Sequence, residues 1–128
     1  MLIVSYSYDD ITYLSKIVQQ ESGTQSFQAK LGVAGTIMNR VRSSKFPNTV
    51  KGVIYDTNYG VQFPPAHTDS FINTVPYKES VIAAKCALRG VNVVRNSLYF
   101  MDTKRASQSW AHKNRPFYTA LGGMSFYE

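Results

Sequence analysis

The chain has 128 residues, 44% apolar and 17% charged, which predicts one globular domain over residues 1–128 and excludes a disordered chain. It carries 14 Lys and Arg against 8 Asp and Glu, so its net charge of +6 favours an anionic partner such as nucleic acid, a membrane surface or an anionic wall polymer. A single cysteine, Cys86, excludes an internal disulfide and a cysteine-rich zinc site, and with 2 histidines we expect neither a metal nor another cofactor.

No apolar run is long enough for a transmembrane helix, so we expect no membrane span. Residues 1–4 are too few for the apolar region of a signal peptide, and two acids, Asp9 and Asp10, follow them. We therefore expect no signal peptide in this chain, although its sequence does not separate a chain made without a secretion signal from a trimmed one.

Two amphipathic helices are predicted first. One begins at Asp9 or Asp10, whose carboxylates can cap free N–H groups, and it runs to 20–21 before Gly23 ends it. The other spans about 25–42 and has the strongest apolar periodicity in the chain, in alternating steps of four and three. Gly32 and Gly35 lower its helix propensity, so we expect them to allow close packing against another element.

The middle of the chain predicts a short helix at 50–55, a long loop at 56–73 and a third substantial helix at 74–89. Pro76 would lie in the first turn of that third helix, and Gly90 follows its end. The pattern then becomes β-like at 97–101, and 121–127 gives a second candidate strand after a Gly-Gly turn. Helices followed by a small antiparallel sheet predict an α+β fold.

Glu21 is the strongest candidate for chemistry, because it ends an amphipathic helix whose apolar face packs on the core. Its carboxyl would lie at the edge of an apolar cleft, where partial burial raises its pKa and retains the proton of a general acid. The competing interpretation is a solvated Glu at a helix end. A glycosidase normally needs two carboxylates, and Asp56, Asp69 and Asp102 are the possible partners, each of which could equally be a cap or turn residue.

Aromatic and amide side chains provide a second signal. Aromatic faces stack on sugar rings and on bases; those expected in loops or strands are Tyr59, Phe63, Tyr99, Trp110, Phe117 and Tyr118. For Tyr99 and Trp110, ligand stacking and core packing are equally good interpretations. Gln62 could donate to an N-acetyl or hydroxyl group or could order its loop, whereas for Asn39 we favour a structural hydrogen bond to a loop backbone.

Basic residues are densest at 104–115, where they could contact phosphates or carboxylates or form a solvated surface. The sequence has no helix-turn-helix or RNA-binding-sheet signature, no phosphate loop and no Gly-x-Ser-x-Gly nucleophile motif. We therefore expect no nucleic acid as a partner, although a basic nucleic-acid binder is kept as a third hypothesis.

Several short motifs follow one another along almost the whole chain: Glu21-Ser22-Gly23, Asn39-Arg40-Val41, Phe46-Pro47-Asn48-Thr49-Val50, Gln62-Phe63, Leu98-Tyr99-Phe100, Trp110 and Gly122-Gly123. Their order resembles the SleB/CwlJ family of cell-wall hydrolases, the spore cortex-lytic enzymes. The resemblance implies a mainly helical, lysozyme-like domain with a small antiparallel sheet. It also implies cleavage of peptidoglycan glycan strands between N-acetylmuramic acid and N-acetylglucosamine.

The family's single essential Glu corresponds to Glu21, and the resemblance implies a lytic transglycosylase reaction that ends in a 1,6-anhydro product. Glu21 would act as general acid and then as general base on the sugar's own C6 hydroxyl, with Gln62, Phe63, Tyr99 and Trp110 binding substrate. The implied location is the spore coat and cortex or the cell wall, during germination. A need for the muramic-δ-lactam of cortex or for an accessory spore protein is left open. The alternatives are a non-catalytic glycan-binding domain and a hydrolytic muramidase or glucosaminidase.

Overall fold

The computed structural model describes residues 6–128. Residues 1–4, which the sequence predicts to be too few for a signal peptide, lie outside the described residues. The helices α1 (Tyr8–Ser22), α2 (Phe27–Arg42), α3 (Val50–Ile54) and α4 (Lys78–Leu88) come first. They are followed by β1 (Tyr99–Asp102), α5 (Trp110–Asn114), β2 (Phe117–Leu121) and β3 (Met124–Tyr127). Short 3₁₀ helices are η1 (Pro64–His67), η2 (Asp69–Phe71) and η3 (Thr103–Gln108). The predicted α+β order is thus confirmed, and in the described part of the chain no helix could span a bilayer.

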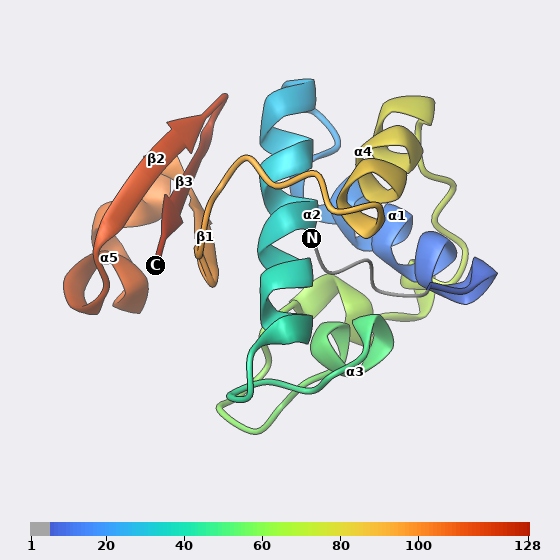
Figure 1. The fold of residues 1–128 in the computed structure, drawn as a ribbon, viewed down its shortest axis with the longest axis horizontal. Coiled ribbons are helices and arrows are strands. Elements are labelled where there is room, and N and C mark those ends of the chain that lie inside the picture. The colour runs from blue at the N-terminus through green and yellow to red at the C-terminus, as the bar shows by residue number, and fades with distance from the viewer. Residues whose placement is uncertain (1–5) are drawn as a thin grey trace.

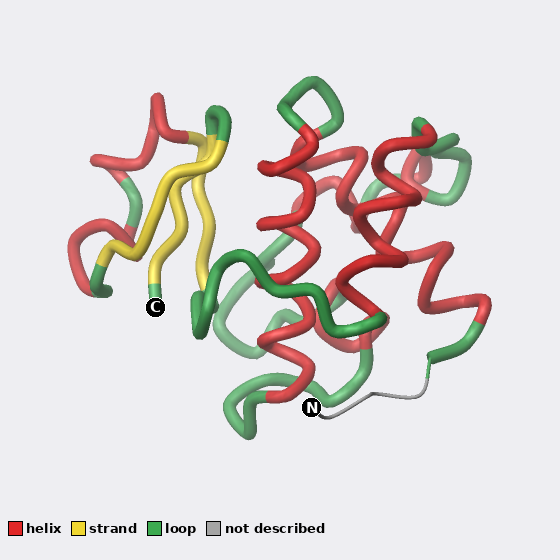
Figure 2. Tube along the Cα trace, turned by 45° about the horizontal axis from the view of Figure 1, so that its top comes forward, coloured by secondary structure: helices red, strands yellow, loops and turns green. Residues whose placement is uncertain are grey.

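Helix α2 lies at the centre of the fold, with the sheet on one side and α1 and α4 on the other (Figures 1 and 2). Its side chains Val33, Ile37 and Met38 are at most 1% exposed because neighbouring elements cover them. A Cβ atom at Gly32 would overlap the Phe126 ring of β3, and one at Gly35 would lie 3.3 Å from Val94. The two glycines therefore allow close packing, as the sequence predicts.

The sheet has the order β1-β3-β2, and both pairs are antiparallel. Side chains alternate across it: Phe100 and Phe126, which lie opposite each other, pack on the main core. Tyr99 and Tyr127 point to the other face, where they join a second apolar cluster beneath η3 and α5. This alternation holds β1 between the core and the small helices.

The C-terminal part confirms one sequence prediction and corrects another. Gly122, with φ 57°, and Gly123 form the predicted Gly-Gly turn, and the strand β3 follows it; Leu121 before the turn belongs to β2. The strand β2 and the helix α5 were not predicted within the polar stretch 102–119. The pattern of β2 is broken by a bulge between Phe117 and Thr119, and α5 spans only 5 residues, which is too short for a visible apolar period.

The helix beginnings also differ from the prediction. Ser7, not Asp9 or Asp10, caps α1, and the Asp10 side chain accepts a hydrogen bond from the Ser7 backbone N–H in a capping box. Helix α4 begins at Lys78 rather than at residue 74. Pro76 disfavours helical backbone at the residue before it, and the Tyr77 N–H donates to Gln19 Oε1 of α1 at 2.9 Å.

Candidate active site

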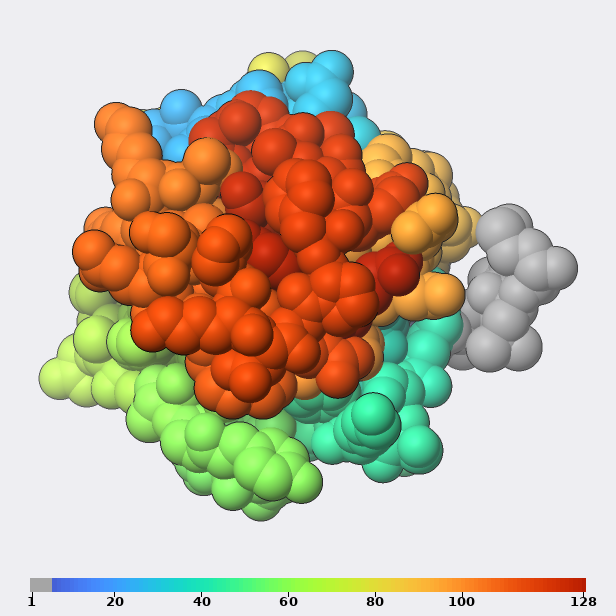
Figure 3. All heavy atoms as spheres, turned by 90° about the vertical axis from the view of Figure 1, so that its left-hand side faces the viewer, coloured from blue at the N-terminus to red at the C-terminus, as the bar shows by residue number. Residues whose placement is uncertain are grey.

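A cleft of about 1180 Å³ is lined by the C-terminal end of α1, Arg40 of α2, residues of the segments 44–46 and 59–65, the segment from β1 to α5, and Met124 of β3. Every residue that the sequence predicts for the site lines it: Glu21, Gln62, Phe63, Tyr99 and Trp110. In Figure 3 the orange and red C-terminal part covers this side of the molecule and borders the green loop around residue 60. The site therefore combines segments from the two halves of the chain.

Glu21 lies in the last turn of α1, where Leu14, Ile17 and Val18 are 0% exposed on the buried face of the helix. Its side chain is half-buried in the cleft wall, and burial raises the pKa of its carboxyl above the usual 4.5. Within residues 6–128 no ion pair joins this carboxylate to a basic side chain. Desolvation is therefore unopposed by a cation, and Glu21 retains its proton to a higher pH than an exposed Glu.

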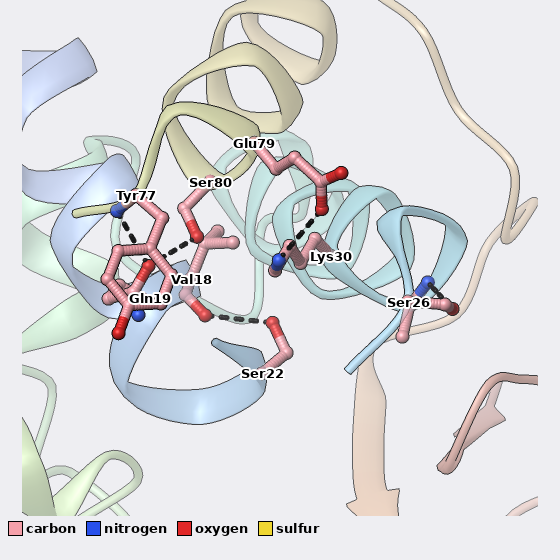
Figure 4. A network of polar contacts seen from close by, with 9 residues as sticks. Val18, Gln19, Ser22, Ser26, Lys30, Tyr77, Glu79 and Ser80 are labelled. Atoms are coloured by element: carbon pink, nitrogen blue, oxygen red, sulfur yellow. Dashed lines mark hydrogen bonds and ion pairs between the residues drawn. The ribbon is translucent and has the colours of Figure 1, made fainter. Parts of the chain in front are cut away.

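The end of α1 is fixed by contacts with α4, which are drawn in Figure 4. Gln19 Oε1 accepts hydrogen bonds from the Tyr77 N–H at 2.9 Å and from Ser80 Oγ at 2.8 Å. Ser22 Oγ donates to the Val18 carbonyl at 2.8 Å, within the same turn. Residues on both sides of Glu21 are thus held, so its carboxyl has a defined position relative to the cleft.

Of the three other acids considered, the structure brings Asp102 into the cleft. Its Oδ1 accepts a hydrogen bond from the Lys104 N–H at 2.9 Å, so it also caps η3. Asp56 is buried and accepts from the Asn58 N–H at 3.0 Å, as a turn residue does, and Asp69 is exposed outside the cleft. Among residues 6–128, no group of three His, Cys, Asp or Glu side chains could hold a metal ion.

The aromatic residues of the cleft differ in accessibility. Trp110 is 59% exposed, and its ring lies 5.5 Å from that of the half-buried Tyr99. Phe63 is 2% exposed and stacks on Phe100 at 5.9 Å, so it forms part of the cleft floor rather than a free surface. Phe46, which the sequence did not single out as a site residue, lines the cleft with its ring 6.5 Å from Tyr99. The accessible platform is therefore Tyr99 with Trp110.

The amide of Gln62 has partners within the chain, because its Nε2 donates to the Gly60 carbonyl at 3.1 Å and its Oε1 accepts from Arg40 at 3.1 Å. These are the contacts expected of a loop-ordering residue, and a contact of Gln62 with substrate stays a prediction. Asn39 Nδ2 donates to the carbonyl oxygens of Arg95 and Ser97 at 2.8 and 2.9 Å. The structural role favoured for Asn39 is confirmed.

Arg40 is the buried cleft residue that the sequence reasoning did not assign a role. It is 4% exposed, and burial lowers the pKa of its guanidinium to about 10. Arg40 follows Val33 and Ile37 at steps of four and three, on the apolar face of α2. A charged residue at an apolar position of a helix is the sequence signal that could have identified Arg40 as a candidate site residue. Of the basic cluster at 104–115, Arg105 also lines the cleft.

Comparison with known proteins identifies relatives of the chain. The profile of a family described as Cell Wall Hydrolase matches residues 24–127, which begin just after Glu21. Spore cortex-lytic enzymes of Bacillus cereus and Bacillus subtilis are 33% and 29% identical to this chain over 82% and 96% of its length. The chain spans 39% of the length of each of these two relatives.

Two solved structures have the same fold. The catalytic domain of the germination-specific lytic transglycosylase SleB from Bacillus anthracis is 30% identical, with a TM-score of 0.84 over 99% of this chain and 100% of that one. The catalytic domain of Bacillus cereus SleB is also 30% identical, with a TM-score of 0.81 over 97% of this chain and 93% of that one. The likeness therefore extends over helices and sheet together.

Proposed function

This chain belongs to the cell wall hydrolase family, and from that membership and the geometry of the cleft we propose that it cleaves the glycan strands of peptidoglycan. The bond is that between N-acetylmuramic acid and N-acetylglucosamine, and Glu21 supplies the catalytic carboxyl. One observation carries this assignment: Glu21 is half-buried in the wall of a large cleft, and burial raises the pKa of its carboxyl.

In the first step the protonated Glu21 carboxyl donates its proton to the glycosidic oxygen. The bond between that oxygen and C1 of the muramyl sugar breaks, its electron pair stays on the leaving oxygen, and positive charge develops at C1. In the second step the Glu21 carboxylate accepts the proton of the C6 hydroxyl of the same sugar, and a bond forms between O6 and C1. The product has a 1,6-anhydro end, and Glu21 regains its proton.

This route needs one carboxyl, because the nucleophile is already part of the bound sugar. A hydrolytic route is the second candidate. The observation that supports this route is the position of Asp102 in the same cleft as Glu21. There, Asp102 would activate a water or stabilise the charge at C1, as the second carboxyl of glycosidases does. The two routes differ in their products, since hydrolysis leaves a reducing end and the internal transfer leaves an anhydro end.

The binding surface is the platform formed by Tyr99 and Trp110. The Trp110 ring is 59% exposed within the cleft, and aromatic faces of this kind stack on sugar rings. Gln62 and Phe63 line the same cleft and complete the proposed substrate-binding set. The cations Arg105 and Lys45 also line the cleft, in keeping with an anionic wall polymer as substrate.

Incubation of the purified chain with peptidoglycan sacculi, followed by mass spectrometry of the released fragments, tests the proposal. Glu21→Gln should abolish release, and its near-ultraviolet circular dichroism should match that of the wild type. Asp102→Asn should retain most of the activity if the anhydro route holds, whereas loss of water-added products in this variant would select hydrolysis. Full release by Glu21→Gln would refute the assignment. Binding of sacculi without any release by the wild type would make the chain a non-catalytic glycan binder.

The similarity to spore cortex-lytic enzymes suggests cortex peptidoglycan as the substrate and germination as its time of action. Parallel digests of cortex, which contains muramic-δ-lactam, and of vegetative sacculi test this part of the proposal. Faster release from cortex is expected. Equal rates on both would leave the chemistry intact and remove the cortex preference.

A further inference from the structure

Arg40 carries a charge that the fold has buried without an ion pair. It is 4% exposed, and among residues 6–128 no carboxylate lies within ion-pair distance of its guanidinium. The buried Asp56 favours the charged guanidinium from further away, but desolvation is the larger effect and lowers the pKa of Arg40. A buried charge is costly, and an apolar residue could fill the same place on the face of α2. The contacts of Arg40 therefore indicate what this cation does in the cleft.

Two hydrogen bonds of Arg40 lead to different chain segments. Its Nε donates to the Leu98 carbonyl at 2.7 Å, directly before β1, and its Nη1 donates to Gln62 Oε1 at 3.1 Å, in the loop that follows α3. Gln62 in turn donates to the Gly60 carbonyl at 3.1 Å. One side chain of α2 thus ties the loop 59–63 and the start of β1 to the same helix.

Three aromatic rings lie close to the guanidinium. Its Cζ lies 4.6 Å from the ring centroid of Phe46, 5.5 Å from that of Phe63 and 5.4 Å from that of Tyr99. Each distance is within the range of a cation–π contact. The ring centroids of Tyr99 and Trp110 are 5.5 Å apart. Arg40 therefore contacts the Tyr99–Trp110 platform directly at Tyr99, and Trp110 is linked to the guanidinium through the Tyr99 ring.

These contacts require arginine rather than another cation. The planar guanidinium offers donors along its edge and two faces for aromatic rings at the same time. A lysine ammonium is a point charge, and it could reach the Leu98 carbonyl or Gln62 without ordering both segments and the rings. The guanidinium therefore fits the task of fixing the relative positions of several parts of one wall.

We propose that Arg40 is the positioning residue of the glycan-binding wall, acting through Gln62 and Tyr99 to hold the loop 59–63 and the Tyr99–Trp110 platform in the geometry that binds the sugar chain. This role rests on the proposed function. It affects the binding of the glycan and leaves proton transfer by Glu21 largely unchanged. Loss of Arg40 should thus raise KM and change kcat little.

Binding is measured in the Glu21→Gln background, with a soluble muramic-acid-containing tetrasaccharide from peptidoglycan and isothermal titration calorimetry. Adding Arg40→Lys should weaken binding roughly tenfold, as expected from the loss of one charge-assisted hydrogen bond. The matched control is Arg42→Lys, an exposed residue two positions further along α2, which should bind like the background. Circular dichroism and thermal unfolding verify that each variant is folded.

Two further measurements separate positioning from a general loss of stability. Trp110 is the only tryptophan, so its fluorescence reports on the platform, and Arg40→Lys should shift its emission without ligand whereas Arg42→Lys should not. Gln62→Leu should weaken binding as well. The double variant Arg40→Lys/Gln62→Leu should bind the tetrasaccharide as well as whichever single variant binds it more weakly, because both residues act in one unit.

The outcomes are distinguishable. Tetrasaccharide binding by Arg40→Lys equal to that of the background, or unchanged Trp110 emission, or additive effects of Arg40→Lys and Gln62→Leu, would overturn the role of Arg40 and leave the proposed function standing. Failure of the Glu21→Gln protein itself to bind the tetrasaccharide would refute the proposed function, and the role of Arg40 with it. A fall in kcat alone, measured with Glu21 present, would assign Arg40 to the chemical step instead.

Discussion

Replacement of Trp110 by alanine tests the aromatic platform. Trp110 is 59% exposed, and since a tryptophan has about 250 Å² of surface, about 150 Å² of it is free in the cleft. A sugar ring stacked on one face covers about half of that area, worth about 1.9 kcal/mol at about 25 cal/mol per Å². Trp110→Ala should therefore raise KM about twentyfold. The fold should survive, because the side chain lies at the surface.

The assay follows release of soluble glycan fragments at several substrate concentrations, so that KM and kcat are separated. Phe117→Ala is the matched control, since Phe117 is 58% exposed but lies on β2 outside the cleft lining. Trp110→Phe should fall between wild type and Trp110→Ala, because it keeps a smaller aromatic face. An unchanged KM in Trp110→Ala, or an equal rise in Phe117→Ala, would refute the stacking argument.

Two other predictions concern Glu21 and Gly32. Burial raises the pKa of Glu21, so the folded state binds more protons than the unfolded state above pH 4.5, and the free energy of unfolding falls as pH rises through the folded pKa. Glu21→Gln should therefore gain thermal stability over the wild type at pH 7 and lose that advantage at pH 4, and melting curves that differ equally at both pH values would contradict this linkage. Gly32→Ala should lower the free energy of unfolding by about 1 kcal/mol, because overlap with the Phe126 ring outweighs the gain in helix propensity. Urea unfolding measures it, with Gly35→Ala, whose Cβ meets a looser contact, as the control; a stabilised Gly32→Ala would disprove the packing argument.

Local sequence patterns predicted the helices well where the apolar period is long. The stripe of α2 is visible in the sequence because its side chains repeat over 16 residues. The position of Glu21 in the cleft wall was also predictable, since the end of an amphipathic helix brings a polar residue to the edge of the core. In contrast, β2 depends on pairing with β3, which lies between it and β1, and such pairing is not recorded in the local pattern.

The sequence predicted which residues belong to the candidate site, but not how their side chains are arranged in space. Asp56, Asp69 and Asp102 were equivalent in the sequence, and only the fold brings Asp102 into the cleft with Glu21. From the sequence, Gln62 could either donate to substrate or order its loop. Its hydrogen bonds with Arg40 and Gly60 are loop-ordering contacts.

The sequence by itself determined the α+β order, the helix that ends at a catalytic candidate and the motifs that resemble one family. These properties depend on neighbours along the chain, whose spacing a helix or strand converts directly into a shared face. The tertiary structure alone decided that Arg40 lies buried among three aromatic rings and joins the loop at 59–63 to Leu98, directly before β1. Those partners are far apart in the sequence, and their contacts are set by how the helices and the sheet pack around α2.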